Sequence, residues 1–322
     1  MDDNTLNKNI IEIPGIKKLD SEKSIYHYTN CRALMNIIKE NEFWVTHAAS
    51  LNDSLEISYI KKIIYDVCCE FLDRKELSKE LYEQIIRGCE YYENDRDLFI
   101  ISFSTNPDSL TLWSEFSNFN GYNIEFDITD FREKLLNSSK IVDSLYDLLE
   151  GNVVYKYTEQ KECIKKIFQE VLDTANKIQE KSNYSTIDWY DLCNSRVEPA
   201  DKYNAINGFF ETLSMALIFY SPFFKDENFK SEEEYRFVLR YIKNKKNEFS
   251  SEINFRDRNE IIIPYIKLPL SKNNDKLKIK SILVGAKNNC DLAITGTKYF
   301  LKENGYSCDK IDVKKSDITL RY

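Results

Sequence analysis

The chain has 322 residues and a net charge of −8, and its 42% hydrophobic content is enough for a sizeable core in one large domain or two ordinary ones. Only 8 glycines and 6 prolines leave little material for flexible linkers, so a glycine-rich phosphate loop is not expected. No stretch approaches about 18 uncharged apolar residues, and the polar start Met1–Asn4 lacks the features of a signal peptide, so we expect a cytoplasmic protein without a membrane partner.

The first elements alternate between strand and helix. Residues 1–22 are polar and predict an N-terminal arm. Ser24–Tyr28 predicts a strand, and Thr29 or Asn30 can then cap a helix whose apolar residues recur at helical spacing. Phe43–Thr46 predicts the next strand.

Two helices and two strands follow. Asn52–Asp53 can cap a helix that runs through Ile64, and a further helix is expected between about residues 75 and 93. Leu98–Phe103 and Tyr122–Phe126 predict strands, because both are short runs rich in apolar and aromatic residues.

The second half of the chain begins with a long helical stretch. From about residue 130 to 218 the periodicity is almost wholly helical, and the apolar stripe from Ile164 to Ile178 has charged residues opposite it. Beyond residue 230 the pattern returns to strands. The later expected elements are strands at Tyr235–Tyr241, Glu260–Ile266 and Lys278–Val284, a helix near Asp291–Asn304 and a last strand around Lys310–Val313.

These elements predict an α+β fold with a mixed or antiparallel sheet. The strands fall into two blocks separated by a helical insert of roughly 90 residues, and strands of one sheet need not be contiguous in sequence. We therefore expect one α+β core that carries an inserted helical lobe, with a crevice where core and lobe meet. The expected segments are the arm at 1–22, the first half of the core at 23–130, the insert at 131–218 and the second half of the core at 219–322.

An acidic run, Glu232–Glu234, precedes Tyr235 and Arg236 at the head of an apolar strand. Three adjacent carboxylates repel one another and contribute nothing to a core, so a functional need for a carboxylate is one interpretation. Glu232 and Glu234 lie on the same side and are suited to stabilise a positive sugar carbon as a leaving group departs. The alternative is a solvated acidic loop that pairs with neighbouring cations.

His27 lies in Tyr26–Thr29, at the end of a short apolar run. Strand alternation places His27 and Thr29 on one face, where both can hydrogen-bond a ligand such as a ribose or a carboxamide, with Tyr28 between them. The other interpretation is a packed, hydrogen-bonded core histidine.

Ser102 and Ser104 end another strand-like segment and share a face, while Phe103 points to the other side. Their hydroxyls can bind a ligand or satisfy neighbouring backbone groups. Trp113 offers a flat surface for stacking a heteroaromatic ring, with core packing as the alternative. Together, the histidine, the hydroxyls, the tryptophan and the glutamates form a candidate nucleotide site.

A basic region is a second candidate site. Residues 225–322 carry 21 Lys and Arg against 15 Asp and Glu, a net charge of +6. This favours an anionic partner near Lys243, Lys245, Lys246 and the cluster Lys272–Lys280, unless these lysines form only a solvated loop.

A metal site is not expected from the cysteines and histidines. The eight cysteines form no Cys-x-x-Cys pair and are expected to be reduced thiols, and His27 and His47 are the only histidines. The one metal-dependent alternative is a nuclease that would use Asp53, Glu56, Glu125 and Asp127.

A series of short motifs supports a resemblance to known families. The motifs are Tyr26–Thr29, Leu51–Glu56, Ser102–Ser104, Leu112–Ser114, Gly121–Asp127, Lys225–Phe229, Glu232–Arg236, Ile263–Tyr265, Ile282–Gly285 and Ser316–Arg321. In this order they resemble a bacterial family, the domain of unknown function 2971. The resemblance covers most of residues 24–322 and leaves the helical insert least defined.

The order of motifs is also similar to that of ADP-ribosyltransferases, which cleave NAD at the nicotinamide ribose. The resemblance implies an ADP-ribosyltransferase-like sheet, NAD as the substrate, and an unknown protein or nucleic-acid acceptor. By this resemblance Glu234 or Glu232 is the catalytic carboxylate. The residues that the resemblance assigns to NAD binding are His27, Tyr28, Thr29, Ser102, Ser104, Trp113 and Arg236.

Two functions follow from these patterns. The first is an NAD-consuming enzyme that transfers ADP-ribose to a macromolecule or hydrolyses NAD, and the resemblance implies a role as a toxin or phage-defence effector. Its chemistry requires no metal, because a fixed carboxylate in a dry pocket lowers the barrier electrostatically. The second is a non-catalytic module that binds a nucleotide or nucleic acid through the basic C-terminal region.

Overall fold

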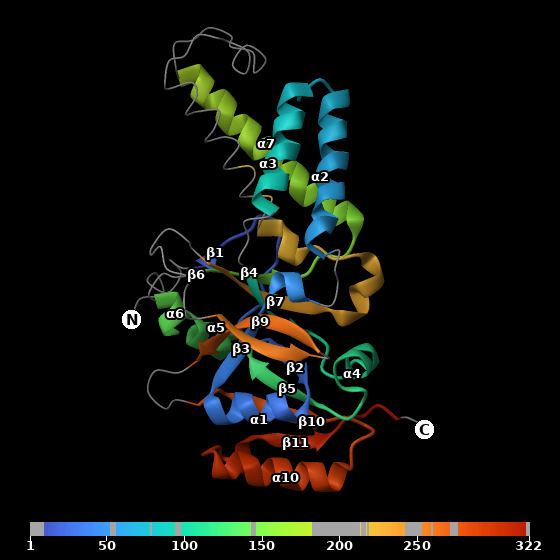
Figure 1. The fold of residues 1–322 in the computed structure, drawn as a ribbon, viewed down its shortest axis with the longest axis vertical. Helices are drawn as coiled ribbons and strands as arrows, with labels where there is room; N and C mark the ends of the chain where they lie inside the picture. Colours follow the sequence, from blue (N-terminus) through green and yellow to red (C-terminus); the bar gives the residue numbers. More distant parts are fainter. Residues whose placement is uncertain are drawn as a thin grey trace.

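The computed structural model describes residues 10–51, 56–77, 79–93, 98–142, 146–181, 213, 217, 219–241, 253–258, 260–270 and 276–319. In these residues one sheet runs through the middle of the molecule, a group of helices stands at one end, and helix α10 covers strand β11 at the other (Figure 1). The predicted α+β class is confirmed. The sheet is mixed, because it contains both parallel and antiparallel neighbours.

The elements of the described residues have the following bounds. The strands are β1 (Ile10–Ile11), β2 (Ser24–Thr29), β3 (Glu42–His47), β4 (Leu98–Ser104), β5 (Tyr122–Asp127), β6 (Tyr146–Asn152), β7 (Glu234–Tyr241), β8 (Ile253–Arg258), β9 (Ile261–Pro269), β10 (Ile279–Val284) and β11 (Asp312–Lys315). The helices are α1 (Cys31–Glu40), α2 (Glu56–Asp73), α3 (Lys79–Glu93), α4 (Leu110–Ser117), α5 (Ile128–Leu136), α6 (Ser139–Val142), α7 (Tyr157–Lys181) and α10 (Cys290–Glu303). Short 3-10 turns are η2 (Ala48–Ser50), η3 (Ser221–Phe223), η4 (Glu227–Glu232) and η6 (Cys308–Lys310). None of these helices is long and apolar enough to cross a membrane.

Strand β4 is the branch point of the sheet. Along one edge it pairs with β7 over its whole length, from Leu98 to Ser104. Along the other edge it pairs with β3 at Phe99 and Ile100 and with β2 at Ser104. The sheet therefore forks at this edge: β3 continues to β9 and β8, whereas β2 continues to β5, β10 and β11.

Because side chains alternate along β4, its two faces pack against two different hydrophobic cores. Phe99, Ile101 and Phe103 point into one hydrophobic core, and Leu98 and Ile100 point into another. The first, which we call the aromatic core, lies inside the fork. The second lies beneath α2, α3 and α7, which we call the helical lobe.

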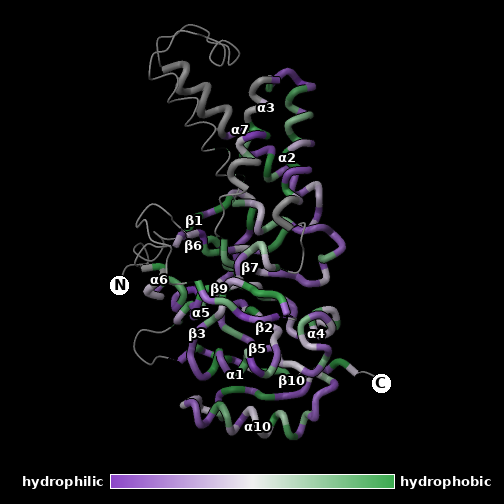
Figure 2. The backbone as a smooth tube through the Cα atoms, in the orientation of Figure 1, coloured by the Kyte–Doolittle hydropathy of each residue, from purple (hydrophilic) through white to green (hydrophobic). Residues whose placement is uncertain are grey.

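The helical lobe is amphipathic and is anchored to the sheet. Coloured by hydropathy, α2 and α3 show alternating apolar and polar stretches, as expected of helices with one buried side (Figure 2). Gln160 at the start of α7 is fully buried and donates to the carbonyl oxygens of Val154 and Lys225 at 2.6 and 2.9 Å. It also accepts from Tyr59 on α2 at 3.1 Å. These bonds tie the lobe to the chain segment that leads into β7.

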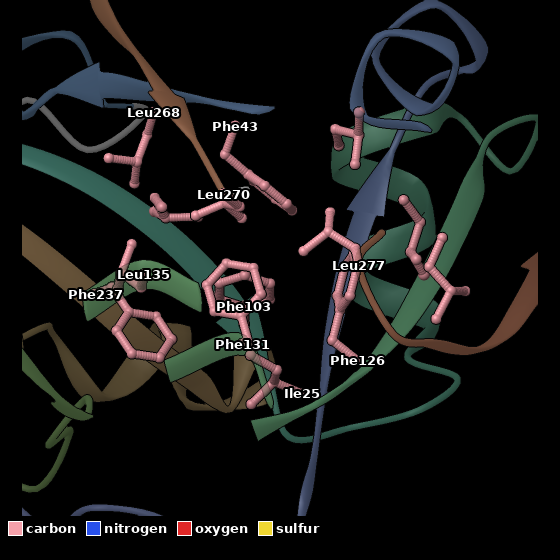
Figure 3. Packing of buried hydrophobic residues seen from close by; sticks show 14 of the residues in the cluster. Ile25, Phe43, Phe103, Phe126, Phe131, Leu135, Phe237, Leu268, Leu270 and Leu277 are labelled. Atoms are coloured by element: carbon pink, nitrogen blue, oxygen red, sulfur yellow. The ribbon is translucent and has the colours of Figure 1, made fainter. Parts of the chain in front are cut away.

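Phenylalanine rings from both branches of the fork meet in the aromatic core, among leucine and isoleucine side chains (Figure 3). Phe43 comes from β3, Phe103 from β4, Phe126 from β5, Phe131 from α5 and Phe237 from β7. The ring centroids of Phe103 and Phe131 are 4.9 Å apart and those of Phe43 and Phe131 are 5.2 Å apart, both edge to face. These rings hold the two branches together.

Strand β6 corrects the expectation that residues 130–218 are almost wholly helical. Leu148 points into the aromatic core and Leu149 into the core of the helical lobe, so both faces of the strand are covered. Glu150 is also buried, in an ion pair with Arg132 at 2.7 Å. With apolar and charged residues buried alike, no alternation in the sequence marks this strand.

The N-terminal arm is corrected in part. Strand β1 pairs in parallel with β6, and Ile13 and Ile16 are buried against the helical lobe. Strand β8 and helix α4 are further elements that the periodicity did not predict. The predicted cap Asn30 is confirmed, because its side chain accepts from Ala33 N at 2.9 Å. The predicted cap Asn52–Asp53 lies outside the described residues, and the domain boundaries stay a prediction.

Replacing Phe103 by alanine is expected to lower the free energy of unfolding by about 3–5 kcal/mol, because the ring is buried where the two branches meet. The matched control is Phe255→Ala, whose ring is 65% exposed and whose loss is expected to cost about 0.5 kcal/mol or less. Urea unfolding followed by circular dichroism measures both values. Equal effects of the two substitutions would contradict the structural role of the aromatic core.

Candidate functional site

The three motifs singled out in the sequence lie on neighbouring strands. Strands β2, β4 and β7 are adjacent in the sheet, with Tyr26 opposite Ser104 and Ser104 opposite Glu234. Ser102 lies opposite Arg236 in the same register. Stretches that are far apart in the sequence therefore meet at one place on the sheet.

Four charged side chains form a closed group at the start of β7, which we call the charged quartet: Lys225, Glu232, Glu234 and Arg236. The ammonium of Lys225 donates to Glu232 Oε2 at 2.6 Å and to Glu234 Oε1 at 2.8 Å. Arg236 donates through Nε and Nη2 to the two oxygens of Glu234, at 2.7 and 2.9 Å. Only 2% to 6% of each residue is exposed. Their hydrogen bonds to one another therefore replace the hydrogen bonds that the charged groups would make to water.

The backbone of the acidic run is held by β4 and by Tyr155. Ser104 Oγ donates to the carbonyl oxygen of Glu232 at 2.8 Å, and the hydroxyl of Tyr155 accepts from Glu234 N at 2.9 Å. The backbone of Glu233 is in the left-handed conformation, with a φ of 45°. Glu232 and Glu234 are therefore buried on either side of an exposed Glu233, and the alternative of a solvated loop describes only this middle residue.

Lys225 is a member of the site to which the sequence assigned no role. It follows Phe223 and Phe224, and its backbone N–H donates to Val154 O at 3.3 Å. Its ammonium lies 4.6 Å from the ring centre of Phe229, where the aromatic face offers additional attraction. A lone lysine directly after an apolar aromatic run was the available signal in the sequence.

The two buried carboxylates differ in proton affinity. Burial raises the pKa of Glu232 to about 8, and the neighbouring Glu234 adds to this rise while Lys225 opposes it. Burial acts in the same direction on Glu234, but the charges of Arg236 and Lys225 and a hydrogen bond from Glu232 outweigh it and hold the pKa of Glu234 well below its usual range. An acid and an anion thus lie side by side near neutral pH, an arrangement typical of active sites.

His27 lies on the other face of the sheet from the charged quartet. Its ring packs against Phe43 and Phe103 at centroid distances of 5.3 and 5.5 Å, and Thr29 on the same side of β2 is buried. Its Nδ1 is 3.2 Å from Ser102 O; because a carbonyl only accepts, Nδ1 carries the proton and Nε2 is an acceptor. Burial lowers the pKa of His27 to about 4. The structure therefore does not bring the imidazole beside the carboxylates.

Tyr28 and Trp113 support the loop after β4. The hydroxyl of Tyr28 donates to Asn106 O and accepts from Ser109 N, both at 2.8 Å. Trp113 is fully buried, meets Tyr28 edge to face at 5.1 Å, and donates from Nε1 to Asp108 at 2.6 Å. Core packing, the alternative for Trp113, is what the structure shows, and a ligand would stack on this indole only after it is uncovered.

The residues of the two other candidate sites are engaged elsewhere or lie outside the described residues. Lys278 and Lys280 form ion pairs with Asp130 and Asp127 at 3.2 and 2.9 Å. Glu125 accepts from the hydroxyls of two serines and a tyrosine. Outside the description lie Lys243, Lys245, Lys246, Lys272, Asp53 and the side chain of Glu56.

Replacing Glu232 by glutamine is expected to change the pH dependence of stability. The pKa of Glu232 is raised from about 4.5 to about 8 by folding, so the proton binds more tightly in the folded state. This stabilisation is complete below the unfolded pKa and is lost as the pH rises through the folded pKa. Wild-type protein is therefore expected to lose stability relative to Glu232→Gln between about pH 5 and 8, as measured by urea unfolding at several pH values.

The exposed neighbour Glu233 provides the matched control for this measurement. Glu233→Gln is expected to follow the wild type throughout the pH range, because its side chain is not part of the charged quartet. A difference between wild type and Glu232→Gln that stays constant across the range would show that Glu232 does not titrate there.

Comparisons with known proteins bear on part of the chain. No curated protein and no solved structure matches it at a significant level. A family model described as "Protein of unknown function (DUF2971)" matches residues 112–237. Strands β2 and β4 lie outside the matched residues, whereas the segment predicted to be a helical insert lies within them. Over residues 112–237, which contain Tyr155 and the whole charged quartet, the predicted resemblance of this chain to that family is therefore confirmed.

Proposed function

We propose that this protein is an NAD-consuming enzyme, similar in its motifs to ADP-ribosyltransferases, that cleaves the bond between nicotinamide and ribose and passes ADP-ribose to a macromolecule or to water. One observation carries the proposal: Glu234 is a buried, ionised carboxylate at the head of β7, next to the strand that ends in Ser102 and Ser104. A role as a toxin or phage-defence effector rests on the resemblance alone.

The proposed reaction places positive charge on the sugar. When the glycosidic bond breaks, its electron pair stays on the ring nitrogen of nicotinamide, which leaves as a neutral molecule, and the ribose carbon becomes oxocarbenium-like. A preorganised carboxylate beside the ribose stabilises this state more than the ground state. Arg236 and Lys225 fix the orientation of Glu234 for this role, and they also keep it ionised.

Glu232 is the exchangeable member of the charged quartet. The oxygens of Glu234 accept from Lys225 and from two nitrogens of Arg236, and Glu232 shares the Lys225 ammonium with Glu234. In the proposed reaction a ribose hydroxyl binds Glu234 and displaces Glu232 from this group. The released Glu232 gives its proton to solvent, and its carboxylate then accepts the proton that the incoming water or acceptor group loses as it attacks the ribose carbon.

In the proposed reaction, residues on the two faces of the sheet have different roles. Ser102 is half-buried on the face of the charged quartet, opposite Arg236. This position supports a proposed contact between Ser102 and the substrate. His27 acts from the other face, where it holds the carbonyl of Ser102. Tyr28 and Trp113 shape the loop that follows Ser104. NAD is the substrate, and none of these roles requires a metal.

Glu234→Gln is expected to lower the rate of nicotinamide release from NAD by about 10²-fold or more, because the amide keeps the shape of the carboxylate and loses its charge. The matched control Glu233→Gln alters the exposed neighbour and is expected to keep the wild-type rate. The assay follows free nicotinamide from labelled NAD, with purified protein alone and with cell extract, after circular dichroism has shown each variant to be folded.

Folded wild-type protein that releases no nicotinamide under either condition would contradict the proposal. The alternative, a nucleotide- or nucleic-acid-binding module, has a different signature: its binding would weaken steeply with salt and would depend on the C-terminal lysines instead of Glu234. The ion pairs of Lys278 and Lys280 reduce the charge available for such binding.

A further inference from the structure

Arg256 on β8 is a half-buried cation that has no acidic partner in the part of the chain that the structure describes. Its Nη2 donates to Thr46 Oγ1 at 2.8 Å, and its Cζ lies 5.9 and 5.6 Å from the ring centres of Trp44 and Tyr265. Its Nε is buried and has no hydrogen-bond partner among the described residues. The guanidinium is therefore held in place while part of its donor capacity is unused.

Two other arginines, Arg132 on α5 and Arg236 on β7, show why this is unusual. Arg132 donates to both oxygens of Glu150, and Arg236 is paired within the charged quartet. Burial lowers the pKa of Arg256, and the nearby Arg258 lowers it further. A buried guanidinium with a like charge beside it and no counter-charge is unfavourable, and a bound anion relieves both problems.

Arg256 reaches the face of the sheet that carries the charged quartet. Its partner Thr46 lies opposite Ile100 on β4, and Ile100 and Ser104 share one face by alternation. Ser104 in turn lies opposite Glu234. Ile100 and Ser104 are four residues apart on β4, which corresponds to about 13 Å along an extended strand.

Ser102 lies between the two positions on this face of β4 and is half-buried, and His27 bonds its carbonyl oxygen from the other face. Along this face the structure thus holds one N–H donor of Arg256 that has no partner among the described residues and, beyond Ser102, the buried carboxylate of Glu234. A molecule with phosphate at one end and sugar hydroxyls at the other is complementary to this face.

We propose that Arg256 binds the diphosphate of the nucleotide whose ribose lies at Glu234. A guanidinium is a planar fork of N–H donors that matches two oxygens of a phosphate. The Nε of Arg256 is buried, so a phosphate bonds it only after the side chain shifts. The bond to Thr46 and the stacked rings of Trp44 and Tyr265, 4.6 Å apart, hold the fork in place, so little freedom is lost on binding. The nucleotide rests on the proposed function, whereas the anion site rests on Arg256, which has no acidic partner among the described residues.

The test is calorimetric titration of the full-length protein with ADP and with adenosine. Arg256→Gln is expected to weaken ADP binding about tenfold or more and to leave adenosine binding unchanged, because only ADP carries phosphate. The matched control is Arg258→Gln, two residues further on the same face of β8 but exposed, and it is expected to bind ADP as the wild type does. Should Arg256→Gln fail to fold, Thr46→Val removes the hydroxyl that orients the guanidinium and is expected to weaken ADP binding alone.

ADP binding that is equal in wild type and Arg256→Gln, or absent from wild type, would overturn the inference. Nicotinamide release measured on the same samples separates it from the proposed function. Turnover of NAD with an unchanged KM in Arg256→Gln would overturn the anion site and support the enzyme. ADP binding that depends on Arg256, in folded protein that releases no nicotinamide, would support the anion site and overturn the enzyme.

Discussion

Strand β4 constrains the rest of the structure, because one of its edges serves two different strands. Phe99 and Ile100 pair with β3 and Ser104 pairs with β2, so Ser102 lies where the two branches separate. His27 donates to the carbonyl of Ser102 at this gap, and its ring completes the packing against Phe103. A side chain thus continues hydrogen bonding where the backbone ladder divides. This explains why a histidine in a strand motif faces phenylalanines instead of a ligand.

The charged quartet is difficult to explain by stability. Taking four charged groups out of water is costly, and well-packed apolar residues at such positions are often as stable or more stable. The group formed by Arg132, Glu150 and Tyr235 on the other face shows a simpler arrangement, in which one carboxylate accepts from one arginine and one hydroxyl. In the charged quartet two carboxylates compete for two cations, and their pKa values move in opposite directions. That competition produces an acid beside an anion, which is useful for chemistry and not for folding.

Much of the fold could be predicted from local sequence. The apolar stripe of α1 has a solvated side opposite it, and β5 is a short run of apolar and aromatic residues. Both elements form where they were expected. Strand β6 is different, since Leu148 and Leu149 enter two separate cores and Glu150 is buried in contact with Arg132 and the hydroxyl of Tyr235. The local sequence does not indicate that a strand is buried on both faces, because strands and helices from elsewhere in the chain cover those faces.

The part of the site whose charged residues are close together in the sequence could be predicted. Glu232, Glu234 and Arg236 form a visible run, and the structure brings them together. Lys225 was not assignable, because its place depends on a bridge between Val154 and Phe224 that only the fold creates. The side of the sheet to which His27 points could not be predicted for a similar reason. Alternation places His27 on the same side of β2 as Ile25, but the fork at β4 determines which side of β2 packs into the aromatic core.

The alternation of β4 also couples stability to binding. Phe103 points into the aromatic core, and its two neighbours, Ser102 and Ser104, necessarily point to the face that carries the charged quartet. A one-residue shift of β4 against β7 would exchange these sides, placing hydroxyls among the rings and a phenyl ring beside Glu234. The packing that closes the fork therefore fixes the register in which a cation, a hydroxyl and two carboxylates share one face, so the aromatic core determines the geometry of the charged quartet without contacting it.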